Sequence, residues 1–380
     1  MNYVRLGDLC VINSGGTPRR NNESYWKNGD IPWVKISDLN NGVVESTEEF
    51  ITLDGLKNSS AKIFPQGTLL YTIFATIGEV AILNIDAATN QAIVGLQLKE
   101  NQKVYLKYIY YYLKSQTNII KQLGRGVAQN NINLSVVKNM IIPIVSLEKQ
   151  SNIIATLSKL EKIKENRIII SNYLDSLIKS RFVELISKNK LIYQKVRLKD
   201  CCLISSGATP SRKNSEYWDE NGINWFKTTE LKNNFLIDSE EKISKLGYEK
   251  TSVKLLPKHT VLIAMYGQGK TRGMTGYLLN NATTNQACAA LISLDIINPK
   301  YLWYTMINSY DRLRNMAKGG TQPNLSVSSI KDFEIILPPI DIQNKFTNYI
   351  EQINKLKSDV QKSIDETQLL MDSLMQEYFG

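Results

Sequence analysis

The stretch VRLGDLCVINSGGTPRRNNESYW, residues 4–26, returns as VRLKDCCLISSGATPSRKNSEYW at residues 196–218, at a constant offset of 192. Shorter matches continue the repeat through each half: ATNQA with TTNQA, Lys138 with Lys331, and Gln150 with Gln343. So long a period excludes a solenoid, whose units have about 20–45 residues. The sequence therefore predicts two copies of a domain, each followed by its own tail.

Within each copy, short apolar runs are broken by Gly, Asn and Pro, a pattern typical of β-strands. In the first copy the runs are VRLGDLCVI, DIPWVKISDL, GTLLYTIFA, EVAILNI and AIVGLQL. One helix should follow, over residues 103–121 and again over 299–316. A long polar helix then closes each copy, over 147–187 and 340–378. We therefore predict an α+β fold with an internal pseudo-two-fold repeat, in which two long helices join two globular domains, each a β-rich core plus helices.

The tails carry narrow apolar stripes at heptad spacing. In the second tail the predicted seam is Phe346, Tyr349, Ile353, Leu356, Val360, Ser363, Thr367, Leu370 and Leu374. In the first tail it is Ile153, Leu160, Ile163, Ile170, Leu174 and Leu177. Because domains and helices alternate along the chain, we predict an antiparallel coiled coil with one domain at each end. About 28 paired residues would span about 42 Å, near the roughly 34–36 Å of one B-DNA turn. An ordinary dimerisation coil would give the same helix pattern.

Composition restricts the class of protein further. The 380 residues have a net charge of +10 and a pI near 9.1, which favours a polyanionic partner such as nucleic acid. No apolar run has the length of a membrane span, and MNYVRLGDLC lacks the core of a signal peptide. The four cysteines form no CxxC pair, as expected for reduced thiols. We expect a cytoplasmic protein with no membrane contact.

Several of these motifs together resemble one known family. The segments SGGTPRRNNESYWKNGDIPWVKISDL, TNQA, QNNINLSVVKNMIIPIVSLEKQ and GTQPNLSVSSIKDFEIILPPIDIQ are similar to motifs of the target recognition domains in type I restriction–modification specificity (S) subunits. The first half departs from this pattern only in having Val145-Ser146 where the second has Pro338-Pro339. The resemblance covers nearly the whole chain. It implies target recognition domains at 1–146 and 191–339, a central spacer helix at 147–190 and a C-terminal spacer helix at 340–380.

The resemblance also implies a function. Each recognition domain would read one part of a split, asymmetric site in double-stranded DNA. The helices would separate the domains and carry two methyltransferase (M) subunits, which motor–nuclease (R) subunits would then join. S-adenosylmethionine, ATP and Mg would be bound by those partners, so this chain would be non-catalytic, with no catalytic residue, cofactor or metal of its own.

Candidate DNA contacts follow from chemistry: cations suit phosphates, and amide or guanidinium groups suit base edges. After SGGTP and SGATP, and after the PW and NW turns, the candidates are Thr17, Arg19, Arg20, Lys35, Thr209, Arg212, Lys213 and Lys227. In the loops that differ most between copies they are Thr76, Tyr266, Gln268, Lys270 and Arg272. In two Gly-rich loops they are Arg125, Gln129, Asn130, Lys318, Thr321 and Gln322.

Some of these positions have an equally simple structural interpretation. Lys35 and Lys227 match between copies, which suits either a phosphate contact or a solvated surface lysine. Gln91 and Gln286 also match, and a structural hydrogen bond explains them at least as well as a DNA contact. The recurring Trp33 and Trp225 lie within apolar runs, so we expect core residues rather than base-stacking platforms.

Other functional classes fit less well. AMYGQGKT at residues 264–271 imitates a nucleotide-binding P-loop, but RGMTGY follows it where a helix should begin. No Asn-Pro-Pro-aromatic motif of an amino-methyltransferase occurs, and His259 is the only histidine, which excludes multi-histidine metal sites. The main alternative is a stand-alone DNA-binding or regulatory protein that dimerises through its coil. A nuclease or ATPase, or an RNA-binding protein, is a more remote hypothesis.

Overall fold

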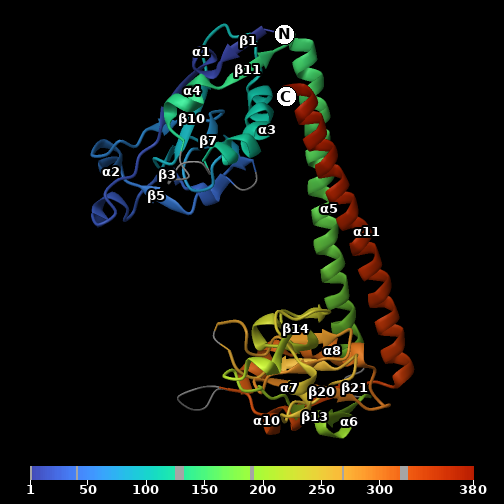
Figure 1. Ribbon diagram of the computed structural model, residues 1–380. Coiled ribbons are helices and arrows are strands. Elements are labelled where there is room, and N and C mark those ends of the chain that lie inside the picture. Colours follow the sequence, from blue (N-terminus) through green and yellow to red (C-terminus); the bar gives the residue numbers. More distant parts are fainter. Residues whose placement is uncertain (1, 40–41, 125–131, 189–191, 268, 317–323) are drawn as a thin grey trace. The chain divides into compact units, whose positions relative to one another are not determined.

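The computed structural model describes the chain apart from residues 1, 40–41, 125–131, 189–191, 268 and 317–323 (Figure 1). It divides into two compact units: residues 1–169 with 361–380, and residues 170–360. Each unit contains one copy of the repeat and part of both long helices. None of the helices in the described residues is long and apolar enough to cross a bilayer.

The first unit is built on a five-stranded sheet of order β2-β10-β7-β8-β4, a four-stranded sheet of order β5-β3-β9-β6, and the pair β1-β11. Its strands are β1 (Asn2–Arg5), β2 (Cys10–Ser14), β3 (Ile31–Val34), β4 (Val43–Val44), β5 (Glu49–Ile51), β6 (Ile63–Phe64), β7 (Leu69–Thr72), β8 (Val80–Leu83), β9 (Ala87–Thr89), β10 (Ile93–Leu98) and β11 (Ile141–Ile144). Its helices before the long one are α1 (Leu6–Leu9), α2 (Leu53–Lys57), α3 (Leu106–Gly124) and α4 (Leu134–Asn139).

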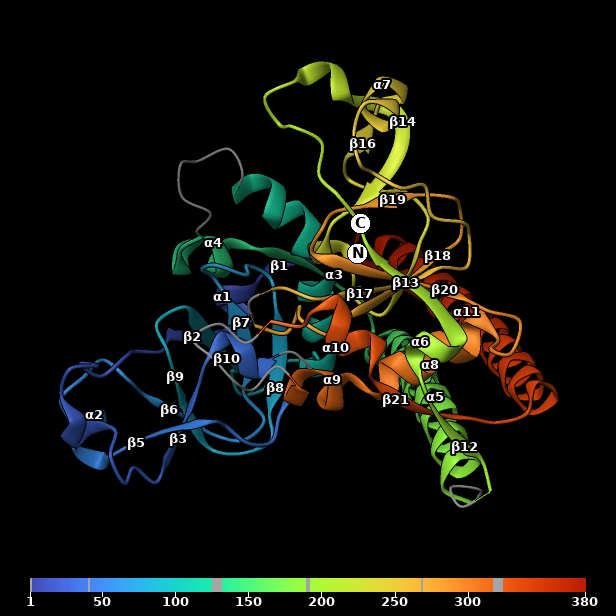
Figure 2. The same cartoon turned by 90° about the horizontal axis from the view of Figure 1, so that it is seen from below.

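The second unit repeats this plan with sheets β13-β20-β17-β18-β15 and β16-β14-β19 and the pair β12-β21. Figure 2 shows β13, β20, β17 and β18 side by side. Its strands are β12 (Gln194–Arg197), β13 (Cys202–Ser206), β14 (Trp218–Phe226), β15 (Asn234–Leu236), β16 (Lys242–Ile243), β17 (Val261–Ala264), β18 (Thr275–Leu278), β19 (Thr283–Thr284), β20 (Cys288–Ser293) and β21 (Glu334–Leu337). Its helices are α6 (Leu198–Cys201), α7 (Lys245–Glu249), α8 (Pro299–Asn308), α9 (Tyr310–Met316) and α10 (Val327–Lys331).

Two local predictions were wrong. The run VRLGDLCVI is not one strand, because the helical turn α1 separates β1 from β2. β1 therefore pairs with β11 while β2 pairs with β10, and one apolar run serves two sheets. The helix predicted over 299–316 is two helices, α8 and α9, that meet at Ser309, a buried residue with φ of −96° and ψ of 8°.

The long helices are α5 (Leu147–Lys188) and α11 (Ile340–Phe379), green and red in Figure 1. In the first unit Lys164 Nζ donates to Gln368 Oε1 at 2.5 Å, and Arg167 donates to the Ser363 carbonyl at 2.7 Å. In the second unit Lys357 pairs with Asp175, and the rings of Phe182 and Phe346 lie 5.6 Å apart. Since the numbers rise along α5 as they fall along α11, the two helices run antiparallel within each unit. The predicted α+β class, internal repeat and antiparallel helix pair are confirmed.

The predicted heptad seam was wrong at alternate positions. On α11, Leu356 and Leu370 are about half exposed, at 51% and 49%, whereas Ile350, Ile364 and Met371 are buried. On α5, Ile170 and Leu177 are exposed, and the buried apolar side chains are Leu157, Leu174, Ile178 and Phe182. The positions from Phe346 onward step by four and then three, not by three and then four. Apolar residues occupy positions in both of these series, so spacing alone did not show which series is buried.

The start of each long helix is fixed to its own domain by a buried glutamine. Gln150 accepts a hydrogen bond from the Tyr105 N–H at 3.0 Å and donates to the carbonyls of Lys103 and Val145 at 3.1 and 2.8 Å. Gln343 makes the same three bonds, to Asn298, Ile296 and Pro338. Both glutamines are fully buried, and all their contacts are to backbone. The repeat therefore extends to the way in which helix and domain are joined.

Candidate nucleic-acid interface

Five side chains of the first unit form a compact cluster that we call the first clamp: Arg20, Trp26, Trp33, Lys35 and Glu49. The Arg20 guanidinium lies 3.9 Å from the Trp26 ring centre and pairs with Glu49. Lys35 Nζ lies 3.0 Å from the same carboxylate. Trp26 and Trp33 meet edge to face at 5.0 Å. The cluster joins the loop after β2 to strands β3 and β5.

The second unit contains an equivalent second clamp: Arg212, Trp218, Trp225, Lys227 and Glu241. Arg212 lies 4.1 Å from the Trp218 ring centre and pairs with Glu241. Lys227 Nζ is 2.7 Å from that carboxylate, and the two indoles meet at 5.1 Å. Trp33 and Trp225 are each only 2% exposed, which confirms the interpretation of these tryptophans as core residues.

The threonines of SGGTP and SGATP are also engaged within the protein. Thr17 donates a hydrogen bond to Gln91, and Thr209 donates to Gln286. These bonds confirm the structural interpretation of the two matched glutamines. They tie the loop that carries each clamp arginine to the TNQA turn. In the first unit the two segments are so close that Gly15 of SGGTP has no room for a side chain, because a Cβ there would lie 2.0 Å from Thr89 Oγ1.

Charge within the clamps is locally compensated. Partial burial would raise the pKa of Glu49, but hydrogen bonds from Arg20 and Lys35 hold it below its usual 4.5. Hydrogen bonds to Glu48 and Glu49 raise the pKa of Lys35 above 10.5. Lys35 and Glu49 are therefore both ionised at neutral pH, and Arg20 and Lys35 both face the Glu49 carboxylate. A phosphate would have to compete with these carboxylates for Arg20 and Lys35.

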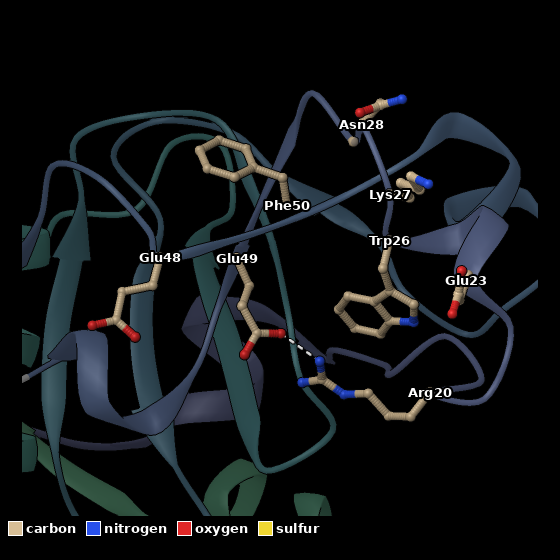
Figure 3. Close-up of a pocket in the computed structure, with 9 residues that line it drawn as sticks. Arg20, Glu23, Trp26, Lys27, Asn28, Glu48, Glu49 and Phe50 are labelled. Atoms are coloured by element: carbon tan, nitrogen blue, oxygen red, sulfur yellow. Dashed lines mark hydrogen bonds and ion pairs between the residues drawn. The ribbon is translucent and has the colours of Figure 1, made fainter.

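A cavity of about 670 Å³ opens beside the first clamp (Figure 3). Its charged lining residues are Arg20, Glu23, Lys27, Glu48 and Glu49. Figure 3 shows the Arg20 guanidinium beside the Trp26 ring and bonded to Glu49. Three carboxylates against two cations leave a formal charge of −1. This net charge disfavours a phosphate in the cavity, despite its arginine.

The remaining predicted contacts fall in three kinds of place. Arg19 and Lys213 are exposed beside the clamps, and Thr76 is exposed in the loop between β7 and β8. In the loop between β17 and β18, Lys270 is exposed, Tyr266 is 40% exposed and Arg272 is half-buried. Seven predicted contacts lie outside the described residues: Arg125, Gln129, Asn130, Gln268, Lys318, Thr321 and Gln322.

The P-loop imitation at 264–271 lacks the architecture of a phosphate-binding loop. In the described residues around it, β17 leads through a loop into β18, and the two strands pair antiparallel. A P-loop places its anion at the N-terminus of a following helix, and here a hairpin takes that position. Elsewhere in the described chain, no group of three or more His, Cys, Asp or Glu side chains could hold a metal ion.

The sequence did not predict the helix side chains that bind the β7–β8 and β17–β18 hairpin loops. Thr117 of α3 donates to the Gly78 carbonyl at 3.0 Å. In the second unit, Tyr310 of α9 donates to the Lys270 carbonyl at 2.8 Å, and Arg314 donates to the Arg272 carbonyl at 3.1 Å. The sequence shows only that Thr117 and Tyr310 occupy equivalent positions of the repeat, at an offset of 193. Two different residue types at equivalent positions do not indicate a contact.

With this geometry established, comparison with known proteins identifies the class. The sequence model of the type I restriction modification DNA specificity domain matches residues 1–171 and again 192–367. The chain therefore belongs to the family of type I restriction–modification DNA specificity domain proteins.

Particular relatives cover nearly the whole chain. The Methanocaldococcus jannaschii type I restriction enzyme MjaIX specificity subunit is 25% identical over 395 aligned residues, covering 98% of this chain and 90% of that protein. The Escherichia coli EcoprrI specificity subunit is 23% identical and covers 94% and 90%.

Two solved structures share the fold. The S subunit from M. genitalium has a TM-score of 0.54 at 17% identity and covers 100% of this chain and 96% of that one. A chain from a structural study of type I R-M complex assembly has a TM-score of 0.63 at 17% identity, covering 99% and 97%.

Proposed function

We propose that this chain is the DNA-specificity subunit of a type I restriction–modification enzyme. The observation that carries the proposal is the double match to the DNA specificity domain, once for each unit. Two units with the same frame and different loops would read two different half-sites. The target is therefore a split, asymmetric sequence in double-stranded DNA.

Chemistry belongs to the partners in this proposal. The chain acts without a catalytic residue of its own, and two methyltransferase subunits bring S-adenosylmethionine to the DNA. Motor–nuclease subunits bring ATP and Mg. The long helices α5 and α11 support the methyltransferases, and the assembly works in the cytoplasm, where the DNA is.

DNA contact is divided between two sets of side chains. The DNA contacts predicted for Arg20, Arg212, Lys35 and Lys227 stay predictions. Each of the four already pairs with a carboxylate, so their main role in this proposal is to hold the fold of the clamps. Arg19 and Lys213 are better phosphate ligands, since both are exposed and neither forms an ion pair within the described part of the chain. Thr76, Tyr266, Lys270 and Arg272, on the hairpin loops, are assigned to base reading.

The test is co-expression with the methyltransferase subunit of the same system, followed by genome-wide mapping of methylated adenine. We expect a split, asymmetric motif that disappears when this chain is omitted. A stable complex that methylates no such motif would favour the alternative, a stand-alone regulator dimerising through its coil. Specific DNA binding by the chain alone, without a methyltransferase, would point the same way.

A control separates the catalytic hypotheses. The purified chain should hydrolyse no ATP, and Lys270→Ala in the P-loop imitation should change DNA specificity only. Competition with RNA of the same sequence should not displace the duplex. ATP hydrolysis by the chain alone that is abolished by Lys270→Ala would contradict the non-catalytic assignment.

A further inference from the structure

The hairpin loops of the two units close in the same way. In the first unit the Gly78 N–H donates to the Thr72 carbonyl at 3.1 Å; in the second the Gly273 N–H donates to the Ala264 carbonyl at 2.9 Å. Both glycines have positive φ, 95° and 86°. The closing pairs match, so the two loops are equivalent.

The loops differ in length between these closing residues. The first contains residues 73–77 and the second residues 265–272, three more. The longer loop also contains Gly267 and Gly269, at φ of 147° and 57°. Glycine at such angles loses much conformational freedom on ordering, so a loop of this kind needs support from outside to hold one conformation.

That support comes from the same helical position in both units, and it is larger where the loop is longer. Thr117 gives the short loop one hydrogen bond, to the Gly78 carbonyl. At the equivalent position Tyr310 reaches further along the loop, to the Lys270 carbonyl at 2.8 Å.

One turn later on the same helix, Arg314 continues the support. It donates both to the Arg272 carbonyl and to the Tyr310 hydroxyl, each at 3.1 Å. Arginine, hydroxyl and carbonyl form a connected chain of hydrogen bonds, which reinforce one another.

The contact is close and involves backbone. A Cβ added to Gly273 would lie 3.4 Å from both Arg314 Cγ and Tyr310 Cδ2, so the loop rests directly on these side chains. Because Tyr310 and Arg314 bind carbonyl oxygens, they fix the path of the loop while Lys270 stays exposed and Tyr266 partly so.

We propose that Tyr310 and Arg314 are positioning residues for DNA specificity, and that the base preference of the second unit depends on them although they touch no base. The inference rests on the proposed function and deepens it. The side chains on the loop read the DNA, and the α9 pair sets the conformation from which they read. A misplaced reading loop loses discrimination because base-edge hydrogen bonds tolerate little displacement.

The experiment uses the complete complex of this chain with its methyltransferase subunits. Methylation rates are measured on a duplex library in which each base pair of both half-sites is varied. Lys270→Ala first identifies the half-site read by the second unit. Tyr310→Phe and Arg314→Met should each reduce discrimination about tenfold at that half-site, the scale of one base contact. The other half-site should keep its preference, and Arg314→Lys should restore part of the loss.

Two controls are built into the chain. Arg312→Met changes an arginine on the same short helix, but one that donates to the Glu334 carbonyl at 2.9 Å and lies 4.5 Å from the Phe333 ring, away from the loop. It should leave both preferences intact. Thr117→Val should weaken preference at the first half-site only.

The possible outcomes are distinct. Unchanged discrimination in Tyr310→Phe and Arg314→Met, or an equal loss at both half-sites or in Arg312→Met, would overturn the inference while the wild-type motif upholds the proposed function. A wild-type complex with no split motif would remove the proposed function itself, and the inference with it. If Arg314→Met does not fold, Tyr310→Phe decides the question alone, since it deletes a single oxygen.

Discussion

The two units have kept different features to different degrees. The clamps agree in every partner, from the stacked arginine to the shared carboxylate. The hairpin loops differ in length, and the side chains that support them differ as well. Duplication has thus preserved the contacts of the clamps and has changed the length of the hairpin loops and the side chains that bind them. Predicted DNA ligands are best sought where the copies disagree.

A second contrast lies where each long helix meets its domain. In the first unit Glu161 accepts hydrogen bonds from Tyr111 and Lys114, both at 2.7 Å. The equivalent residue in the second unit is Asn354, which donates to Tyr304 at 3.4 Å. A carboxylate in the first unit is thus replaced by an amide in the second, where the ion pair between domain and long helix is instead Lys300 with Glu351. The buried glutamines, by contrast, agree.

The largest effect is expected at the shared glutamines. Gln150→Leu or Gln343→Leu leaves three backbone groups that are at least partly buried without their partners, and an unsatisfied buried group costs about 1–3 kcal/mol. We expect a loss of about 3–5 kcal/mol in the free energy of unfolding, similar for the two variants, measured by urea denaturation. Asn344→Ala, which removes an exposed side-chain bond to Asn298, should cost under about 1 kcal/mol. A mild Gln343→Leu would show that the junctions are not equivalent.

The next largest effect is expected along the buried face of α5. Ile178 is 7% exposed and its neighbour Leu177 is 47% exposed. Ile178→Ala should cost about 2–3 kcal/mol, and Leu177→Ala under about 1 kcal/mol, in the same denaturation experiment. The reverse order would restore the seam expected from the sequence.

The stability that Glu161 gives the first unit should depend on pH. Burial raises the pKa of Glu161, but Lys114 and Tyr111 outweigh it and leave that pKa below 4.5. The folded pKa is then lower than the unfolded one, so the carboxylate stabilises the first unit above about pH 4.5, and the stabilisation is lost as pH falls through the folded pKa. Glu161→Gln should therefore cost about 1–2 kcal/mol at pH 7, and the cost should shrink in acid. The cost of Asn354→Ala should not change over this range.

The smallest effect on stability is expected at the clamps. Arg20 and Arg212 have half-exposed side chains, at 52% and 53%, where an ion pair contributes about 0–1 kcal/mol and a cation–π contact about 0.5–1 kcal/mol. Each Arg→Met variant should lose about 1 kcal/mol, equally in the two units. Salt dependence of DNA binding is the sharper measurement: Arg19→Met should reduce the slope by about 1 and Arg20→Met should not. A reduced slope in Arg20→Met would return that arginine to the phosphate contacts.

Sequence alone was sufficient for the repeat, the fold class and the ends of the long helices, because each depends on patterns many residues long. It failed where a choice depends on a neighbour distant in sequence. Whether Ile350 and Ile364 or their neighbours Tyr349 and Ser363 face the partner helix depends on how that helix packs, which the spacing does not reveal. The ion pair of Arg20 could not be foreseen either, because its carboxylate partner, Glu49, stands 29 positions away; the DNA contact predicted for Arg20 stays a prediction. Tyr310 gave no signal, since its partner is a backbone carbonyl.

The division of the helices has a consequence for synthesis of the protein. Met371, Met375 and Phe379 are buried in the core of the first unit, where Phe379 packs 5.1 Å from Tyr108. The second unit, by contrast, is one continuous segment, residues 170–360. Synthesis proceeds from the N-terminus. The first unit, although begun first, cannot be completed until residues 361–380 are made, whereas the second unit is complete once residue 360 has been added. The order of translation and the order of completion are opposite.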